Sequence, residues 1–293
     1  MHYTLNKGFS ILTKDTGSVP VYCLCLENST KSNAVFQHCM QSGDHMLNKN
    51  DILEIVREQL AVEYNCKPGD FDGKENVLTS PGFDDKRRKF TDNPLLFKMV
   101  TLGGNAVISA DERLHDKLNE FIENKEGHWL FEYPNLKVID DLLIPFDEKL
   151  FQTHHMFLPF GQSKKTNSYI PVKWYEGNEI HQFYGSEKFP NALCREYKPE
   201  RPDLIAVTAF DNNEIIGMAG CSADTPDMWQ IGIDVDEKHR GKGIGTLLVS
   251  LLKDEILSRG KIPYYGTSLS NLYSWHIALN CGFIPAWIEV GTW

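Results

Sequence analysis

One short stretch, VDEKHRGKGIGTLL from Val235 to Leu248, constrains the fold of this chain more than any other. Within it, eight residues hold three glycines and four basic or potentially basic side chains, although the formal net charge of the chain is -10. The apolar MWQIGIDV before it predicts a strand, and the apolar spacing after it predicts a helix that ends near Gly260. A strand that turns through glycines into a helix presents unpaired N–H groups, so the stretch predicts a site for a phosphate or pyrophosphate.

Two familiar phosphate-binding motifs do not fit this spacing. A Walker A loop needs G-x-x-x-x-G-K-[ST], but Lys242 is followed by a glycine, and the position where the first glycine belongs is Asp236. A dinucleotide fingerprint needs G-x-G-x-x-G, whereas these glycines run G-x-G-x-G, with Thr246 where the third glycine belongs. The remaining alternative is a solvated basic turn that happens to precede a helix.

Length and composition indicate a globular protein of two domains. At 293 residues the chain exceeds the usual size of one domain, and we predict an N-terminal α/β domain over 1–145 and a second domain over 146–293. No apolar run approaches the ~18 residues that span a bilayer, and no secretory signal is visible, so we expect a cytoplasmic protein without a membrane segment. The acidic balance argues against nucleic-acid binding, and seven scattered cysteines fit neither a disulfide framework nor a zinc site.

The first half mixes helices and strands. Apolar spacing predicts a helix from Asn50, capped by Asn50 or Asp51, and a strand near 76–79. LFKMVTLGGNAVISA predicts a hairpin that turns at its two glycines, and DERLHDKLNEFIEN predicts a helix capped by Asp111. Residues 130–150 show no periodic element longer than one or two turns, so the domain boundary is placed there.

The second half predicts the element order β-β-β-α-β-α-β. LIAVTAF and IIGMAGCSA form a hairpin around the turn DNNE, and MWQIGIDV is the third strand. After the glycine-rich turn and its helix come the strand IPYYGTS, a helix from about Ser270 to Asn280, and the strand FIPAWIEV. This order predicts an α+β fold with helices on a sheet.

Two motifs in this half resemble the GNAT superfamily of acyl-CoA N-acyltransferases. RGKGIG, from Arg240 to Gly245, fits the family's R/Q-x-x-G-x-G/A motif, between a central strand and the following helix. SNLYSWHIALNCGF, from Ser270 to Phe283, resembles the second pattern, in which an Asn opens a helix that ends in Gly-Phe. Together they cover about residues 150–293. The resemblance implies a mixed, mostly antiparallel sheet flanked by helices, acetyl-CoA as co-substrate and no metal.

The resemblance also implies roles for individual residues. The backbone N–H groups of the glycine-rich turn would hold the coenzyme A pyrophosphate, assisted by the Thr246 hydroxyl and the Arg240 charge. The main chain of Ile233 and Val235 would pair with the pantetheine arm and donate to the thioester carbonyl, and Asn271 would contact the arm from the other side. The coenzyme-binding residues predicted in this way are Ile233, Val235, Arg240, Gly241, Lys242, Gly243, Ile244, Gly245, Thr246, Asn271 and Ser274.

Transfer to an amine also needs a base for the nucleophile and a proton for the leaving thiolate. Many members of the family supply that proton from a tyrosine seven residues after the Asn, but this position is Ala278 here. Tyr273, His276 and Ser274 lie on the same helix segment and could substitute, and a thiol with a pKa near ~8.5 also leaves without a dedicated acid. Asp234, the one carboxylate within the third strand, could act as the base or could instead hydrogen-bond loop backbone.

Several other residues have two readings. Asp224 and Asp227, in the loop before the third strand, are further candidates for the base. The pair His154-His155 lacks a third ligand at metal spacing, so ordinary strand residues are favoured over zinc. The segment from Trp174 to Leu193 falls where the family's variable helices shape the acceptor site. Four aromatic residues could line an acceptor pocket but are more typical of a core, namely Trp229, Tyr264, Tyr265 and Trp287.

The expected function is that of an N-acetyltransferase, which moves an acetyl or other acyl group from acetyl-CoA to a primary amine of a small molecule or peptide by direct attack on the thioester. An acidic pocket would suit a cationic acceptor. The alternative is a catalytically inactive acyl-CoA-binding sensor or scaffold, which the departure at Ala278 makes reasonable. The smaller N-terminal domain could be a degenerate copy of the same fold that covers the acceptor cleft or mediates formation of a homodimer.

Overall fold

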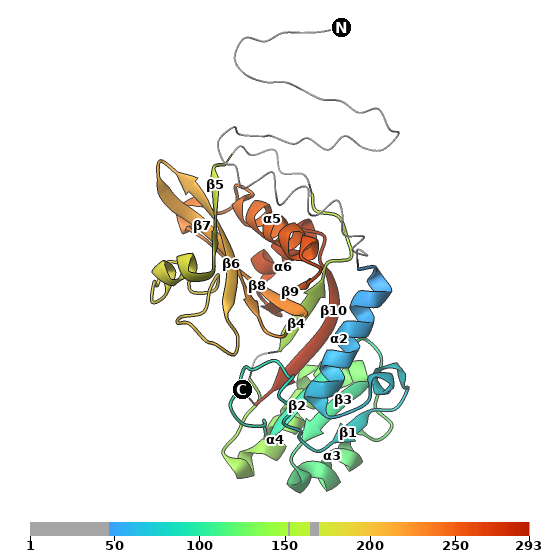
Figure 1. Ribbon diagram of the computed structural model, residues 1–293. Coiled ribbons are helices and arrows are strands. Elements are labelled where there is room, and N and C mark those ends of the chain that lie inside the picture. The colour runs from blue at the N-terminus through green and yellow to red at the C-terminus, as the bar shows by residue number, and fades with distance from the viewer. Residues whose placement is uncertain (1–46, 152, 165–169, 293) are drawn as a thin grey trace, which may run out of the picture. The chain divides into compact units, whose positions relative to one another are not determined.

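The computed structural model of this protein is built on one β-sheet (Figure 1). The structure describes residues 47–151, 153–164 and 170–292, which belong to one compact unit. Within these residues, ten strands form the sheet. Across the sheet they lie in the order β1 (Val77–Thr79), β3 (Ala106–Ala110), β2 (Phe97–Thr101), β10 (Ile284–Gly291), β4 (His154–Leu158), β9 (Ile262–Ser268), β8 (Met228–Val235), β7 (Glu214–Ala223), β6 (Asp203–Asp211) and β5 (Val172–Glu176).

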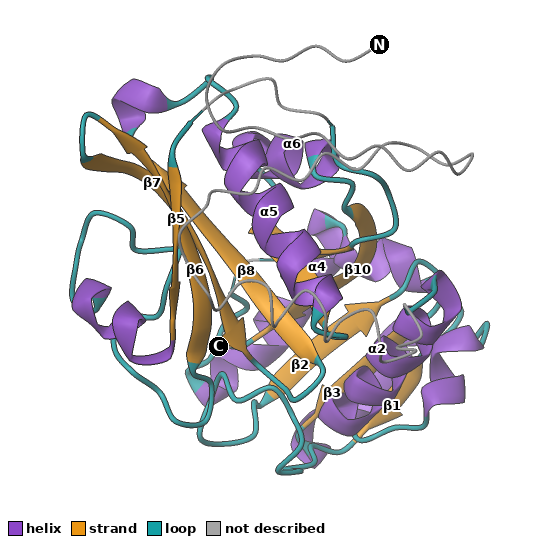
Figure 2. Ribbon diagram, turned by 45° about the horizontal axis from the view of Figure 1, so that its top comes forward, coloured by secondary structure: helices purple, strands orange, loops and turns teal. Residues whose placement is uncertain are grey.

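The sheet is mixed and mostly antiparallel. Among the described strands, β1 with β3 and β8 with β9 are parallel pairs, and the other neighbours are antiparallel. Figure 2 shows how strongly the strand direction turns between β5 and β1, as expected for a wide twisted sheet. A mixed sheet with helices packed on it confirms the predicted α+β class.

Helices cover both faces of the sheet. α5 and α6 pack on the face that carries Ile231 and Tyr265, and α3 and α4 cover the same face further along, around Met99 and Val290. α2 packs on the opposite face, against Tyr264 among others. We call these sides the α5 face and the α2 face. The helices are α2 (Lys49–Tyr64), α3 (His115–Ile122), α4 (Tyr133–Leu143), α5 (Ile244–Ser258) and α6 (Leu272–Asn280).

The element order predicted for the second half is confirmed from β6 to β10. The β6–β7 turn places Asn212 and Asn213 in the left-handed region, with φ of 47° and 68°, which asparagine adopts more readily than most residues. α5 ends before Gly260, whose φ of 68° closes the helix. His154 and His155 lie in β4, which confirms their assignment as strand residues.

In the first half, the hairpin β2–β3 and the strand β1 are confirmed, and two details differ. The cap of α2 is Asn48, not Asn50 or Asp51, because the Asn48 side chain accepts from both of their N–H groups. The region 130–150 contains α4, a helix of 11 residues. Leu136, Ile139 and Leu143 lie at helical spacing and pack against the sheet, but exposed apolar residues such as Val138 obscure this period in the sequence.

The predicted domain boundary between residues 145 and 146 stays a prediction, but strands from both sides of it share the sheet. β10 lies between β2 of the first half and β4 of the second, and it pairs antiparallel with each. The hypothesis that the first half copies the second is likewise untested, and residues 1–46 lie outside the described residues. Among the described residues, no helix is both long and apolar enough to cross a membrane.

On the α2 face a buried ion-pair network joins α2, the loop after β1 and β10. Arg88 is 4% exposed and lies 2.7 Å from Glu63 and 2.8 Å from Glu289, measured from Nη2 to the nearest carboxylate oxygen. Burial raises the pKa of Glu63, but the neighbouring Arg88 outweighs this effect and holds the pKa below its ordinary value. Because all three groups are out of water, each carboxylate depends on Arg88 for compensation of its charge.

Replacing Arg88 with methionine should lower the free energy of unfolding by about 3–5 kcal/mol, because two buried carboxylates lose their shared cation. Urea unfolding followed by circular dichroism measures this change. Arg113→Met is the matched control, because its ion pair with Asp111 is largely exposed and such pairs contribute at most about 1 kcal/mol. Equal unfolding midpoints for the two variants would contradict the role given to Arg88.

Candidate functional site

The glycine-rich turn leaves the start of α5 open. Gly241 and Gly243 have φ of 76° and 79°, and no atom of the residues that the structure describes lies within 4 Å of the place where a Cβ would stand. The left-handed φ explains both glycines, because other residues adopt it at a cost. Among the described residues no side chain caps α5, and the Leu247 N–H is already bonded to the Gly243 carbonyl at 3.0 Å. The N–H groups of residues 244–246 are therefore the donors that this helix end offers to an anion.

The third glycine of the turn has an additional role. A Cβ on Gly245 would lie 2.8 Å from the side chain of Ile277 on α6. Gly245 therefore lets α5 and α6 approach each other closely, which brings the start of α6 beside the turn. The sequence pattern alone assigned this glycine to the ligand and gave no sign of the helix contact.

The basic residues of the turn differ in what they contact. Arg240 donates from Nε to the Val235 carbonyl at 3.1 Å, which tethers its guanidinium to the end of β8. The His239 ring lies 3.2 Å from Asp236 and 3.4 Å from Asp211, so these carboxylates offset any charge on it. Lys242 is exposed and lies outside the cleft described next, unlike the other residues predicted to bind the coenzyme.

The turn opens into a cleft of about 540 Å³ between β8, α5 and α6. The cleft brings together all the predicted coenzyme-binding residues except Lys242, and all three predicted catalytic residues. Asn271 also caps α6, because its Oδ1 accepts from the Ser274 N–H at 3.2 Å. The predicted residues that line the cleft are Ile233, Asp234, Val235, Arg240, Gly241, Gly243, Ile244, Gly245, Thr246, Asn271, Tyr273, Ser274 and His276.

Two parallel strands part beside this cleft. β8 pairs with β9 only from Met228 to Ile231, and Ile231 lies opposite Tyr265. On its other side, β8 pairs with β7 as far as Val235. Within the described residues, the edge of β8 that faces β9 therefore has no strand partner over residues 232–235. An open strand edge of this kind offers N–H and C=O groups to an extended ligand.

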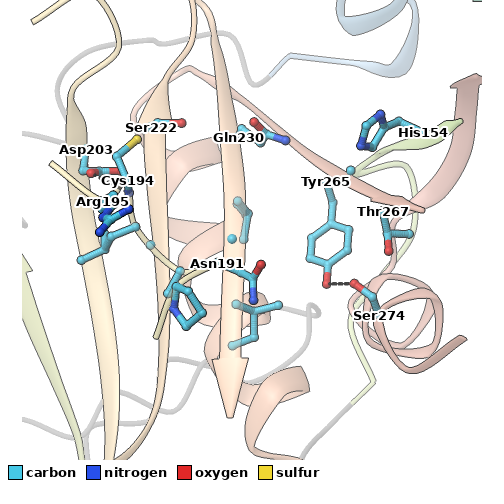
Figure 3. Close-up of a pocket in the computed structure, with 18 of the residues that line it drawn as sticks. His154, Asn191, Cys194, Arg195, Asp203, Ser222, Gln230, Tyr265, Thr267 and Ser274 are labelled. Carbon is cyan, nitrogen blue, oxygen red and sulfur yellow. Dashed lines mark hydrogen bonds between the residues drawn. The ribbon is translucent and has the colours of Figure 1, made fainter. Parts of the chain in front are cut away.

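A second pocket, of about 600 Å³, meets the cleft at this gap (Figure 3). Its floor on the α2 face includes Ser222, Gln230 and His154, and its outer wall is the loop that follows the 3-10 helix η5 (Gly177–Phe183). The last four residues of the segment expected to shape specificity, 190–193, lie in this wall. The cleft and the pocket share four lining residues, Asn191, Ile233, Asn271 and Ser274.

Asp234 holds that wall against the sheet. Its carboxylate accepts from the Asn191 N–H at 2.6 Å, from the Asn191 Nδ2 at 2.7 Å and from the Ala192 N–H at 2.9 Å. Two glycines make room for the loop, because a Cβ on Gly232 would lie 1.9 Å from the Asn191 carbonyl oxygen, and one on Gly220 would lie 2.3 Å from that of Ala192. The loop therefore lies directly on β7 and β8.

These contacts match the second of the two roles that the sequence left open for Asp234, binding of loop backbone. The other two candidates for the base do not line the cleft or the pocket. Asp224 is buried and bonded to Ser222 and Tyr264, whereas Asp227 pairs with Lys261 at 3.1 Å.

Tyr265, which the sequence placed among aromatic residues typical of a core, lies at the gap between β8 and β9. It is buried, and its hydroxyl is 2.6 Å from the Ser274 Oγ, as Figure 3 shows. Burial raises the pKa of Tyr265 to about 12. The predicted acids Tyr273 and His276 line the cleft but are exposed, Tyr273 by 87%. Strand alternation showed only that Tyr265 would be buried, not which hydroxyl it would meet.

The two histidines of β4 point to opposite faces of the sheet. The His155 ring packs against Trp275 of α6, with 5.0 Å between centroids, whereas His154 lines the second pocket (Figure 3). Burial lowers the pKa of His154, which favours a neutral ring at pH 7. Over the part of the chain that the structure describes, no group of three or more His, Cys, Asp or Glu residues could hold a metal ion.

Comparison with known proteins gives one match to a family model and several distant structural similarities. A model of the acetyltransferase (GNAT) family matches residues 140–283. A comparison with curated proteins found no match. Similar solved structures include a GNAT-family acetyltransferase from Novosphingobium aromaticivorans, at 12% identity over 49% of this chain and 64% of that one, with a TM-score of 0.39.

Two other similar structures align over more of their length. A GCN5-related N-acetyltransferase from Sphaerobacter thermophilus aligns at 10% identity over 81% of this chain and 90% of that one, with a TM-score of 0.43. A Drosophila protein aligns at 11% identity over 91% and 97%, with a TM-score of 0.40. The chain spans less than two thirds of the Novosphingobium structure. At 10–12% identity, none of the three structures identifies a substrate for this chain.

Asp234→Asn should loosen the pocket wall, because an amide accepts with one oxygen only and turns its NH2 group toward other donors. Hydrogen exchange at the Asn191 and Ala192 amides should accelerate by about 10- to 100-fold, corresponding to the loss of a charge-assisted hydrogen bond. Asp227→Asn, which removes an exposed ion pair with Lys261, is the control. Unchanged exchange in Asp234→Asn would show that the carboxylate does not anchor the loop.

Proposed function

Because residues 140–283 match the model of the GNAT acetyltransferase family, we propose that the protein transfers an acetyl or other acyl group from acetyl-CoA to a primary amine. The observation that carries this proposal is the meeting of the cleft and the second pocket at the gap between β8 and β9. One side of the gap offers helix-end donors and an open strand edge, which suit a coenzyme. The other side offers a polar pocket, which suits an acceptor.

The cleft has the donors that a pyrophosphate and a pantetheine arm require. The N–H groups of residues 244–246 would hold the phosphates, with Arg240 adding positive charge beside them. The free edge of β8 at Ile233 and Val235 would bind the amide groups of the arm as a neighbouring strand does. The thioester supplies an activated carbonyl carbon and a thiolate leaving group.

In the reaction, the amine nitrogen forms a bond to the carbonyl carbon, and the carbon–sulfur bond breaks. His154 is the group in the second pocket best suited to take the amine proton, because burial lowers its pKa and leaves a ring nitrogen unprotonated at pH 7. An N–H group on the open edge of β8 would stabilise the oxyanion of the tetrahedral intermediate. Asp234 acts as a positioning residue that holds the pocket wall.

Tyr265 and Ser274 are suited to stabilise the leaving thiolate, because the pair lies at the gap that the cleft and the pocket share. With a pKa of about 12, Tyr265 keeps its proton at neutral pH. Full transfer of that proton to a thiolate with a pKa near ~8.5 would be unfavourable. The pair therefore donates a hydrogen bond to the thiolate, which then takes a proton from solvent.

One observation favours the alternative of an acyl-CoA-binding module without turnover. Ala278, at the position of the family's usual acid, is fully buried, so no side chain from that position reaches the cleft. Thiol release from acetyl-CoA, measured beside a calorimetric titration of the coenzyme, separates the two functions. Release with at least one amine supports the transferase, whereas binding without release from a broad amine panel supports the binding module.

Gly243→Glu should weaken acetyl-CoA binding on the order of 100-fold in calorimetry, because it places a negative side chain against the pyrophosphate. Gly260→Glu is the matched control, since Gly260 also has a left-handed φ and open space around it but lies at the other end of α5. Both variants carry similar backbone strain. Equal affinity in the two variants would remove the glycine-rich turn from the coenzyme site.

Tyr265→Phe should lower kcat by about 10- to 100-fold and leave the acetyl-CoA Kd unchanged, because the phenol acts on the departing thiolate. The defect should be constant from pH 7 to pH 10, since a tyrosine with a pKa of about 12 stays protonated over that range. Tyr273→Phe should change kcat little, because that hydroxyl is exposed. A larger defect in Tyr273→Phe than in Tyr265→Phe would reverse the assignment.

A further inference from the structure

We propose that the second pocket takes an acceptor that carries a carboxylate as well as its primary amine, with Arg195 and Arg201 as the carboxylate-binding groups. This inference rests on the proposed acyl transfer and names the substrate class of the same site. It differs from the cationic acceptor that the acidic composition of the chain suggested.

Arg195 is a cation without a counter-ion in the described part of the chain. It lines the second pocket, and its side chain makes no ion pair or hydrogen bond with any described residue. Its backbone is fixed, because the Arg195 carbonyl accepts from the Gly185 N–H at 2.9 Å and the preceding Cys194 N–H donates to Asp203 at 3.0 Å. A guanidinium on an ordered loop can bind a carboxylate with two parallel hydrogen bonds.

Arg201 is more buried and has donors to spare. Its side chain is 21% exposed, and its Nη2 donates to the Cys194 Sγ at 3.2 Å. Its buried Nε has no hydrogen-bond partner among the described residues, since the nearest carboxylate oxygen, on Asp224, is 3.7 Å away. Because this Nε is shielded and faces Asp224, the Nη groups are the donors that a ligand oxygen in the pocket could reach.

Among the described residues, Asp224 forms an ion pair with Arg201 at 3.7 Å, and no carboxylate forms one with Arg195. Among the described lining residues the charged side chains are Arg195, Arg201 and Asp203, two cations and one acid. Burial raises the pKa of Asp203, which favours its neutral form. Burial also raises the pKa of Asp224, which lies behind the pocket and is bonded to Ser222 and Tyr264. The pocket is therefore locally positive in a chain whose formal net charge is -10.

The position of the arginines sets the spacing between the two groups of the acceptor. Figure 3 shows Arg195 beside Asp203 on β6, and Tyr265 with Ser274 on the other side of β8. In register, Asp203 lies opposite Ser222, Ser222 opposite Gln230, and β9 follows β8. Three strand spacings amount to about 14 Å, part of which the long Arg195 side chain can bridge. The amine and the carboxylate are therefore several bonds apart, as in an ω-amino acid or a dipeptide.

The test compares acceptors that differ only in the carboxylate. Thiol release from acetyl-CoA is measured with 6-aminohexanoate against 6-aminohexanamide, with glycylglycine against glycylglycinamide, and with glycine. We expect kcat/KM to be about 10- to 100-fold higher for each carboxylate than for its amide, because a charge-assisted hydrogen bond is lost in the amide. The longer acceptors should also exceed glycine, and the two carboxylate series distinguish an amino acid from a peptide as the source.

Variants assign the effect to the arginine. Arg195→Gln should abolish the preference for carboxylates over amides, and it should act on the carboxylates through KM more than kcat. Arg195→Lys should restore part of the carboxylate preference, and Arg195→Glu should shift the preference toward 1,5-diaminopentane. Arg113→Gln, at an exposed arginine outside the pocket, is the control. Equal rates for carboxylate and amide, or a carboxylate preference that survives Arg195→Gln, would overturn the proposal.

A binding measurement separates failure of this proposal from failure of acyl transfer. Calorimetry with the expected product, N-acetyl-6-aminohexanoate, and with its neutral amide is carried out in the presence of coenzyme A and needs no turnover. Tighter binding of the carboxylate, lost in Arg195→Gln, supports the anion site even if no amine releases thiol. Thiol release with neutral or cationic amines alone would support the transferase and refute the anion site.

Discussion

The functional architecture depends on one interruption of backbone pairing. β8 and β9 run parallel through Ile231 and Tyr265, and among the described strands nothing continues that pairing on β8 toward Val235. Backbone N–H and C=O groups need partners, so an open edge inside a sheet is a place where a ligand or water completes the hydrogen bonds. β8 leads directly into the glycine-rich turn before α5. Within the described part of the chain, the unpaired edge of β8 therefore lies beside the uncapped N-terminus of α5. Ser274 and Tyr265 then meet on the other side of the gap.

A second constraint is the close approach of a loop to the sheet. Gly220 and Gly232 lie opposite each other on β7 and β8, and the loop at Asn191 and Ala192 occupies the space that their side chains would fill. Asp234 completes the contact by accepting three hydrogen bonds from that loop. The two glycines and the half-buried Asp234 carboxylate thus fix the wall that carries Arg195. The acceptor specificity that we propose would in this way depend on the backbone of the central strands.

The α2 face also links the pocket to the first half of the chain. Arg201 approaches Asp224, and Asp224 accepts from the hydroxyl of Tyr264. Arg88, which compensates Glu63 and Glu289, lies 5.8 Å from the Tyr264 ring. Such a layer of polar groups is stable only when each group keeps its partners, so removing α2 or the loop after β1 would leave charges buried next to the pocket.

The sequence by itself determined the element order from β6 to β10 and the glycine-rich turn, because these depend on local periodicity and on glycines needed for φ near 76–79°. The resemblance of its two motifs to a family named most of the residues around the cleft, but not Asn191 or Ile277. The sequence did not reveal the three-turn α4, because exposed apolar residues such as Val138 obscure the helical spacing of the buried Ile139 and Leu143. Nor did it show that Asp234 faces a loop some forty residues earlier, that Gly245 makes room for Ile277, or that Tyr265 meets Ser274. Tertiary structure decided these points, because each is a contact between segments far apart in the chain, and local patterns report which side of an element is buried but not what lies against it.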